Sequence, residues 1–153
     1  MHDRTPTFQF FVPGKPVGKA RPRHNTKTGN TYTPKRTADY ERHVRECFEA
    51  KYPLSEPVSG PVSMMINAIV PVPRTKDGVH LTKQYRNECF AGLRKPTGKP
   101  DCDNIVKIIC DALNGIAYKD DKQIYAHQME KAYSMRDGEI GCGVTVTIDE
   151  FQE

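Results

Sequence analysis

The sequence contains no tryptophan, only 8% aromatic residues and no long hydrophobic run. No apolar stretch approaches the ~20 residues that a membrane-spanning helix needs. The opening decapeptide, MHDRTPTFQF, also lacks the hydrophobic region of a secretory signal. These absences predict a cytoplasmic protein that has no contact with the membrane. With 153 residues, 37% of them hydrophobic and 27% charged, the chain suits a single soluble globular domain over residues 1–153.

Cysteine is scarce and irregularly spaced. The five cysteines are odd in number, and no two of them form a CxxC pair. The spacing therefore suggests neither a disulfide framework nor a zinc site. We interpret these residues as small apolar side chains in a reducing compartment. They are Cys47, Cys89, Cys102, Cys110 and Cys142.

A large net charge is also missing, since the chain carries only +4, but its basic residues are unevenly distributed. Residues 15–45 hold nine basic and two acidic residues, a charge of +7, which leaves −3 for the remainder. Such a basic block on a small domain is typical of a protein that contacts a phosphate backbone. It is equally typical of a solvated surface, so charge alone leaves both interpretations open.

Short aromatic and β-branched runs predict four strands. They cover Thr7–Val12, Pro61–Val72, Gln123–Tyr133 and Cys142–Ile148. Two segments rich in glycine, proline and cations, at about 14–34 and 73–99, are predicted to be basic surface loops. The second loop has room for a short helix over Thr82–Leu93.

Two longer helices are predicted from apolar residues that recur at three- and four-residue spacing. The first follows Pro34, takes Thr37 as its N-cap and ends near Tyr52. The second begins at Asp103, which can cap the first turn, and ends at Asn114–Gly115. The order strand, helix, strand, helix, strand, strand predicts a small α/β (α+β) fold, in which helices pack on a mixed β-sheet.

The segment 99–121 carries the candidate chemistry. Asp101 and Asp103 are two positions apart, so on an extended entry to the helix their side chains point to the same side. Lys107 follows Asp103 by one helical turn and shares its face. If the next strand lies beside the segment that feeds the helix, Asp121 closes on both aspartates. Three converging carboxylates repel one another unless a cation lies between them, and all-oxygen ligation suits Mg²⁺ or Mn²⁺.

Each of these residues also has an ordinary structural interpretation. Asp103 can be an N-cap and nothing more, and Asp120–Asp121 can be a simple turn. Lys107 can be a solvated helix residue, and Asp111 is better explained as a surface or ion-pair residue than as a ligand. The pattern alone therefore leaves a metal site and a set of structural carboxylates as alternatives.

The segment KPDCDNIVKIICDALNGIAYKDDKQI closely resembles the signature of the RusA family of Holliday-junction resolvases, which reads approximately KPDxDNxxKxxxDALNGxxxxDDxQI. The stretches GKPVGKARPR and TYTPKRTADYE are similar to the corresponding parts of that family. The resemblance implies a RusA-like α/β homodimer that binds a four-way DNA junction and cuts it symmetrically with Mg²⁺, with Mn²⁺ as a substitute. It also implies a role in DNA recombination and repair, in a phage or prophage setting.

By position in the motif, the resemblance implies that the catalytic, metal-binding aspartates are Asp101, Asp103 and Asp121. The catalytic lysine falls on Lys107, where it can neutralise charge on the phosphate. Asp120 is then only a neighbour of the third ligand. The basic arm gains the role of contacting phosphates without reading bases. We assign this role to Lys15, Lys19, Arg21, Arg23, Lys35 and Arg36.

Two other functions compete with junction cleavage. The first is a protein that binds branched DNA without cutting it. Three carboxylates near a polyanion argue against that function, because a pure binder has no use for them. The second is a flap or nicking nuclease on the same scaffold, which only a comparison of substrates separates from a resolvase.

Overall fold

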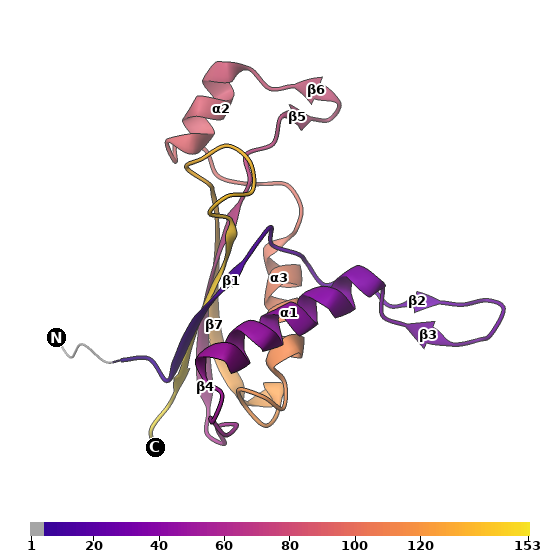
Figure 1. Ribbon diagram of the computed structural model, residues 1–153, viewed down its shortest axis with the longest axis vertical. Coiled ribbons are helices and arrows are strands. Elements are labelled where there is room, and N and C mark those ends of the chain that lie inside the picture. The colour runs from indigo at the N-terminus through magenta and orange to yellow at the C-terminus, as the bar shows by residue number, and fades with distance from the viewer. Residues whose placement is uncertain (1–4) are drawn as a thin grey trace.

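The computed structural model describes residues 5–153, and a four-stranded sheet lies at its centre (Figure 1). The strands are β1 (Phe8–Pro13), β4 (Val62–Val70), β7 (Ile124–Tyr133) and β8 (Gly143–Glu150). Their order in the sheet is β1-β8-β4-β7. Strand β8 runs antiparallel to both of its neighbours, whereas β4 and β7 are parallel. All four strands predicted from the sequence are confirmed, and the sheet is mixed as expected.

The parallel pairing of β4 with β7 fixes the direction of the helix between them. A chain that leaves the carboxyl end of one parallel strand must return to the amino ends of the strands before the next parallel strand can begin. Helix α3 (Cys102–Leu113) makes this return. The first turn of α3 therefore lies near the carboxyl ends of β4 and β7, and its last turn lies near the amino end of β7 (Figure 1).

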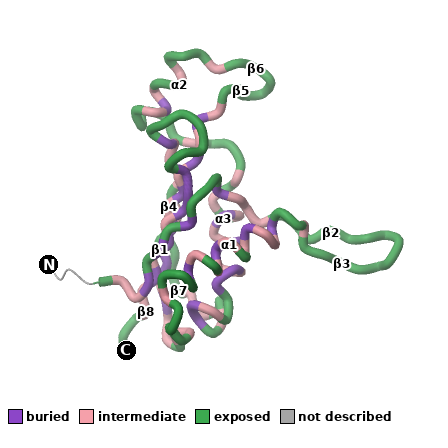
Figure 2. The backbone as a smooth tube through the Cα atoms, viewed as in Figure 1, coloured by how far each residue is buried: buried purple, intermediate pink, exposed green. Residues whose placement is uncertain are grey.

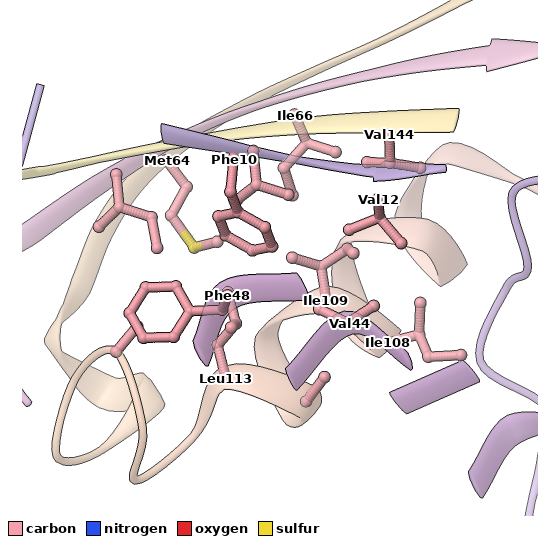
Figure 3. Packing of buried hydrophobic residues seen from close by; sticks show 14 of the residues in the cluster. Phe10, Val12, Val44, Phe48, Met64, Ile66, Ile108, Ile109, Leu113 and Val144 are labelled. Atoms are coloured by element: carbon pink, nitrogen blue, oxygen red, sulfur yellow. The ribbon is translucent and has the colours of Figure 1, made fainter. Parts of the chain in front are cut away.

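Two helices, α1 (Lys35–Lys51) and α3, cover one face of the sheet (Figure 1). Buried residues alternate with exposed ones along β1, which places Phe10 and Val12 on this covered face. Figure 3 shows the resulting core, in which side chains from the sheet interdigitate with those of both helices. The helices contribute Val44, Phe48, Ile108, Ile109 and Leu113, each no more than 1% exposed. The apolar stripe predicted for α3 is confirmed.

The opposite face of the sheet carries no helix among the described residues (Figure 1). Two large apolar side chains are exposed on it, Phe11 at 47% and Met65 at 44%. The fold is therefore a two-layer α+β arrangement with one open sheet face.

Both basic loops contain more structure than the sequence predicts. The segment 14–34 includes a hairpin of β2 (Arg23–His24) and β3 (Thr31–Tyr32), which projects away from the sheet with all of its residues exposed (Figures 1 and 2). The segment 73–99 forms a small module above the sheet. It consists of β5 (Thr75–Lys76), β6 (Val79–His80) and α2 (Lys83–Phe90). The short helix expected at Thr82–Leu93 is thus confirmed within narrower limits.

Two predictions about helix starts are corrected. Helix α1 begins at Lys35 with Pro34 in the N-cap position, so Thr37 is not the cap. Thr37 is instead buried, and its hydroxyl accepts a hydrogen bond from the Ala20 backbone N–H at 3.4 Å. Helix α3 begins one residue earlier than expected, with Asp101 at the cap position and Asp103 in the first turn.

All five cysteines are free thiols. None of the helices within residues 5–153 combines the length and apolarity that crossing a membrane would require.

Candidate functional site

The start of α3 presents two exposed carboxylates, Asp101 and Asp103. Asp101 occupies the N-cap position, yet its side chain makes no capping hydrogen bond. Among residues 5–153, neither carboxylate has a hydrogen-bond or ion-pair partner. The unpaired N–H groups of the first turn and the helix dipole both favour negative charge at this end. Two carboxylates within the first turn of α3 are therefore free to accept hydrogen bonds or bind a cation.

Lys107 lies one turn further along α3 and is exposed. Its ammonium group forms no ion pair with any residue in the described part of the chain. Because residues four apart share a helix face, Lys107 stands beside Asp103. A positive charge that is free of partners is thus available next to the two carboxylates.

Asp101 also forms part of the wall of a groove of about 540 Å³. The loop after β1, strand β2, the start of α1 and the loop before α3 provide the remaining walls. The cations that line this groove without an acidic partner among residues 5–153 are Lys15, Arg23, Arg36 and Lys99. These cations would attract a polyanion such as DNA and so could bring one of its phosphates close to the negatively charged Asp101.

A close approach at Gly18 fixes the loop after β1 against the start of α3. A Cβ atom at Gly18 would lie 3.0 Å from the Cβ of Pro100 and 3.1 Å from that of Asn104. The Lys19 backbone N–H also donates to the Asn104 carbonyl at 2.9 Å. The basic loop and the acidic end of the helix therefore form one surface.

Lys19 itself is occupied by acidic partners. Its ammonium lies 2.5 Å from Glu41 on α1 and 3.0 Å from Asp111 on α3. Burial lowers the pKa of Lys19, but the hydrogen bonds to these two carboxylates outweigh that effect and raise it. Lys19 therefore joins the two helices, and Asp111 is an ion-pair residue, as expected.

The other cations predicted to contact phosphates are placed differently. Lys15, Arg23 and Arg36 gather at the groove. Lys35 is paired with Asp39 at 2.9 Å. Arg21 is exposed but does not line the groove. The structure thus brings three of the six predicted residues together beside Asp101 without pairing them to acidic groups.

Asp121 lies at the opposite end of α3 from Asp101. It opens the 3-10 turn η1 (Asp121–Gln123), and its backbone N–H donates to the Asn114 side chain at 3.1 Å. Asn114 is the C-cap of α3, and a helix of this length spans ~18 Å. Convergence of the three aspartates within one chain is therefore not observed. Within residues 5–153, no three His, Cys, Asp or Glu side chains are grouped so as to hold a metal.

The physical reason is the direction of α3. The expectation placed the strand after the helix beside the segment before it. Helix α3 connects two parallel strands, so it runs from their carboxyl ends back to their amino ends. The residues before and after the helix therefore lie at opposite ends of the strands.

Asp120, the neighbour of Asp121, has a structural role. Its carboxylate accepts a hydrogen bond from the Lys122 backbone N–H at 2.9 Å, and its own N–H donates to the Gln123 side chain at 2.8 Å. The hydrogen bond from Lys122 holds the pKa of Asp120 below its ordinary value. Of this aspartate pair, Asp120 caps the turn and Asp121 stays exposed.

The end of α3 is further secured by Tyr118, which is fully buried. Its hydroxyl donates to the Cys110 carbonyl at 2.7 Å. Burial raises the pKa of the Cys110 thiol to about 11, and the negative charges of Asp111 and Asp121 add to this effect. The thiol therefore stays protonated at neutral pH, and its position agrees with the interpretation of this cysteine as an apolar filler.

Sequence reasoning missed two residues that shape the site. Lys99 lines the groove, and its position two residues before Asp101 is a signal that was available. Lys131 on β7 donates to the Gly98 carbonyl at 2.8 Å and to the Pro100 carbonyl at 3.0 Å. It thereby holds the loop that leads into α3. No local pattern marks this role, because the partners are more than thirty residues away in the chain.

Comparison with known proteins gives two matches. Residues 13–148 match the family model described as "Endodeoxyribonuclease RusA". The chain is also 34% identical over 129 residues to a protein of Bacillus subtilis (strain 168) described as "Uncharacterized protein YqaN". That alignment covers 83% of this chain and 88% of the relative. The family match includes the groove, both ends of α3, the whole of β4 and β7, β8 up to Ile148 and only the last residue of β1.

Proposed function

The chain belongs to the RusA family of endodeoxyribonucleases, and on this basis we propose that it is a metal-dependent nuclease that resolves Holliday junctions by paired symmetric nicks. Its role would lie in DNA recombination and repair. The observation that carries the proposal is the pair of unpartnered carboxylates at the start of α3, Asp101 and Asp103, the first of which lines a groove together with several cations. A groove of this kind can hold a DNA phosphate. The carboxylates would repel that phosphate unless a cation lay between them.

The donor set suits Mg²⁺, with Mn²⁺ as a substitute. Asp101, Asp103 and Asp121 offer only oxygen atoms, which hard divalent cations prefer. Asp101 and Asp103 are exposed and not engaged by other side chains, so they would not have to give up existing partners. When bound, such an ion lowers the pKa of a coordinated water and polarises the phosphodiester.

The basic residues of the site bind and orient the DNA. Lys15, Arg23, Arg36 and Lys99 neutralise the phosphates that enter the groove, without contacts that depend on base sequence. Lys107 stands one turn from Asp103 and compensates the negative charge that develops on the phosphate under attack.

A homodimer gives Asp121 a place in this site. In one chain Asp121 lies a helix length away from Asp101, so it would reach the metal only from a second subunit. A two-fold axis would bring the end of α3 from each subunit to the start of α3 in the other, and would produce two equivalent sites. Two nicks at a junction with two-fold symmetry need that arrangement.

Nicking of a synthetic four-way junction, compared with a linear duplex of matched sequence, tests the function. We expect paired symmetric nicks that require Mg²⁺, stop in EDTA and disappear in Asp103→Asn. Cleavage of flaps or nicking of duplex, with the junction left intact, would replace the resolvase with the nuclease alternative. Tight junction binding with no cleavage in Mg²⁺ or Mn²⁺ would instead support the binding protein.

Mixing two inactive variants tests the shared site. If Asp121 acts across the dimer, a heterodimer of Asp103→Asn and Asp121→Asn contains one intact site and one site with both defects. We expect mixtures that have exchanged subunits to recover single nicks, while each variant alone stays inactive. A mixture as inactive as its parents would show that Asp121 acts within its own chain, and an active Asp121→Asn parent would show that it has no role.

A further inference from the structure

A second cavity adjoins the groove on the other side of a shared wall. Lys15–Pro16 and Lys99–Pro100 line both spaces. The second cavity, of about 270 Å³, lies at the carboxyl ends of β4 and β7, where Val70 and Tyr133 are paired in register. Helix α2 closes it from the other side with Tyr85. The crevice beyond the carboxyl ends of parallel strands is a common position for ligand sites.

The lining combines flat apolar surfaces with a few polar groups. Tyr85 and Tyr133 are half-buried, and neither hydroxyl has a hydrogen-bond partner among residues 5–153. Pro71 and Pro96 add rigid apolar walls, and Lys76 joins the two shared lysines among the lining residues. Aromatic rings with adaptable hydroxyls and nearby ammonium groups suit a planar, polar-edged ring that is attached to phosphates.

We propose that this cavity is a base-binding subsite, which takes one unstacked nucleobase of the DNA strand whose phosphate lies in the adjoining groove. The inference rests on the proposed nuclease function. The position of the two spaces on either side of one wall supports it, because a strand that crosses the wall of Lys15 and Lys99 would have its backbone on one side and a base on the other. The volume is below the ~300–1,000 Å³ of pockets for drug-sized ligands, which favours a single ring system.

A branched substrate offers such a base at low cost. Removing a base from a continuous stack costs a few kcal/mol, and least where the base is already mismatched or single-stranded. The crossover of a junction interrupts stacking, so a base next to it can enter the cavity more easily than one within a duplex. The subsite would thus contribute to structure selectivity as well as to base preference.

Ion pairs and hydrogen bonds hold the walls of the subsite in place. Asp137, in the loop between β7 and β8, pairs with Arg86 of α2 at 2.6 Å and with Arg74 at 3.2 Å. On the opposite side, Lys131 bridges the carbonyls of Gly98 and Pro100. The Arg94 guanidinium stacks 4.0 Å from the centre of the Tyr85 ring, which fixes that ring. A cavity fixed on both sides is prepared for a rigid planar ligand.

Fluorescence of 2-aminopurine, placed next to the crossover of a four-way junction, tests base capture directly. Asp103→Asn is used as the background so that the DNA stays intact. We expect the emission to change on binding, and to change less when Tyr133→Leu or Tyr85→Leu is added. Tyr125→Leu is the matched control, because Tyr125 is an exposed tyrosine at the other end of β7.

Cleavage gives a second readout in the otherwise wild-type enzyme. A panel of junctions carrying each of the four bases beside the nick should show a preference that Tyr133→Leu flattens. Loss of one base–aromatic stack is expected to lower kcat/KM about 5- to 150-fold on the preferred base. Tyr133→Phe, which keeps the ring and loses the hydroxyl, should keep the rate and alter the preference. Thermal melting confirms that each variant is folded.

The outcomes separate the subsite from the function. If the wild type cuts junctions but Tyr133→Leu, Tyr133→Phe and Tyr85→Leu leave both base preference and fluorescence unchanged, the subsite is wrong and the nuclease stands. If the enzyme cuts flaps instead, the same labelled base is placed at the flap, and the same comparison decides. A protein that binds no branched DNA would overturn both proposals.

Discussion

Two aspartates flank each end of helix α3, and the fold treats the two pairs in different ways. Asp101 and Asp103 at the start keep their carboxylates free of other side chains, and cations line the space beside Asp101. At the far end, Asp120 is consumed in capping a turn, and Asn114 and Tyr118 are hydrogen-bonded to their surroundings. Only Asp121 stays exposed there.

Under the proposed function, Asp101 and Asp103 serve the chemistry at one end of α3, whereas at the other end Asp120 serves the fold and Asp121 is offered to the site of a second subunit. Asp101 and Asp103 are exposed, so water can hydrate both carboxylates, but two like charges close together still repel and cost free energy. In the proposed function a bound divalent cation would offset that repulsion. At the far end, Asp120 shows what the same residue type does when it serves the fold alone.

Removing charge at the start of α3 should have the largest effect on activity. We expect Asp101→Asn to lower junction cleavage by at least ~100-fold, because metal coordination provides several kcal/mol of transition-state stabilisation. Its melting temperature should change little, because the loss of repulsion from Asp103 is offset by the loss of the favourable interaction with the helix dipole. Nicking rates and thermal denaturation measure the two effects. Asp120→Asn is the control and should cut at close to the wild-type rate; equal losses in both variants would remove the distinction between the ends.

Truncating the core at the far end should have the largest effect on stability. Leu113 is fully buried against the sheet, so Leu113→Ala should lower the free energy of unfolding by ~2–5 kcal/mol through lost burial and a cavity. Urea denaturation gives this value. Cleavage by the folded fraction should persist. A loss of less than about 1 kcal/mol would mean that this end of the helix is not held by the core.

A smaller effect is expected at Tyr118. Tyr118→Phe removes the hydrogen bond to the Cys110 carbonyl and should cost ~1 kcal/mol of unfolding free energy, with the nicking rate unchanged. Tyr125→Phe, at an exposed tyrosine, serves as the comparison and should not alter stability. If Tyr118→Phe instead slowed cleavage at full stability, the far end would have a role in the chemistry.

The smallest effect concerns the charge of Asp120. Its pKa in the folded protein is below the ordinary 3.8, so ionised Asp120 stabilises the fold above that pH. The stabilisation disappears as the pH falls through the lowered folded value. Wild type should therefore melt slightly above Asp120→Asn at neutral pH, and the gap should close in strong acid. If the difference in melting temperature grew as the pH fell, the pKa of Asp120 would be raised by folding and not lowered.

Local patterns predicted the parts of this protein that depend on local sequence. Alternation identified the strands, the apolar stripe identified α3, and the acidic motif led to a family that the comparison confirms. The placement of Asp121 was not predictable in this way. It depends on whether β4 and β7 pair in parallel, which neither strand's own pattern reveals.

The ion pairs of Lys19 were hidden for a similar reason. Its partners Glu41 and Asp111 lie on two helices that are distant in the chain, and only tertiary packing brings them together. Thr37 has the residue type of a typical N-cap, but it lies inside the helix. Its buried hydroxyl accepts a hydrogen bond from the Ala20 backbone N–H. In each case a contact between distant segments outweighed a local preference.

The position of β8 in the sheet has a consequence for protein synthesis. Strand β1 pairs only with β8 among the described strands, and β8 also separates it from β4. The ribosome makes β1 first and β8 last, so the N-terminal strand must wait for its partner until almost all of residues 5–153 have been translated. Until then β4, α3 and β7 can associate, but the loop that carries Lys15 has no anchored strand before it. The groove beside Asp101 is therefore completed late in synthesis, once β8 has emerged.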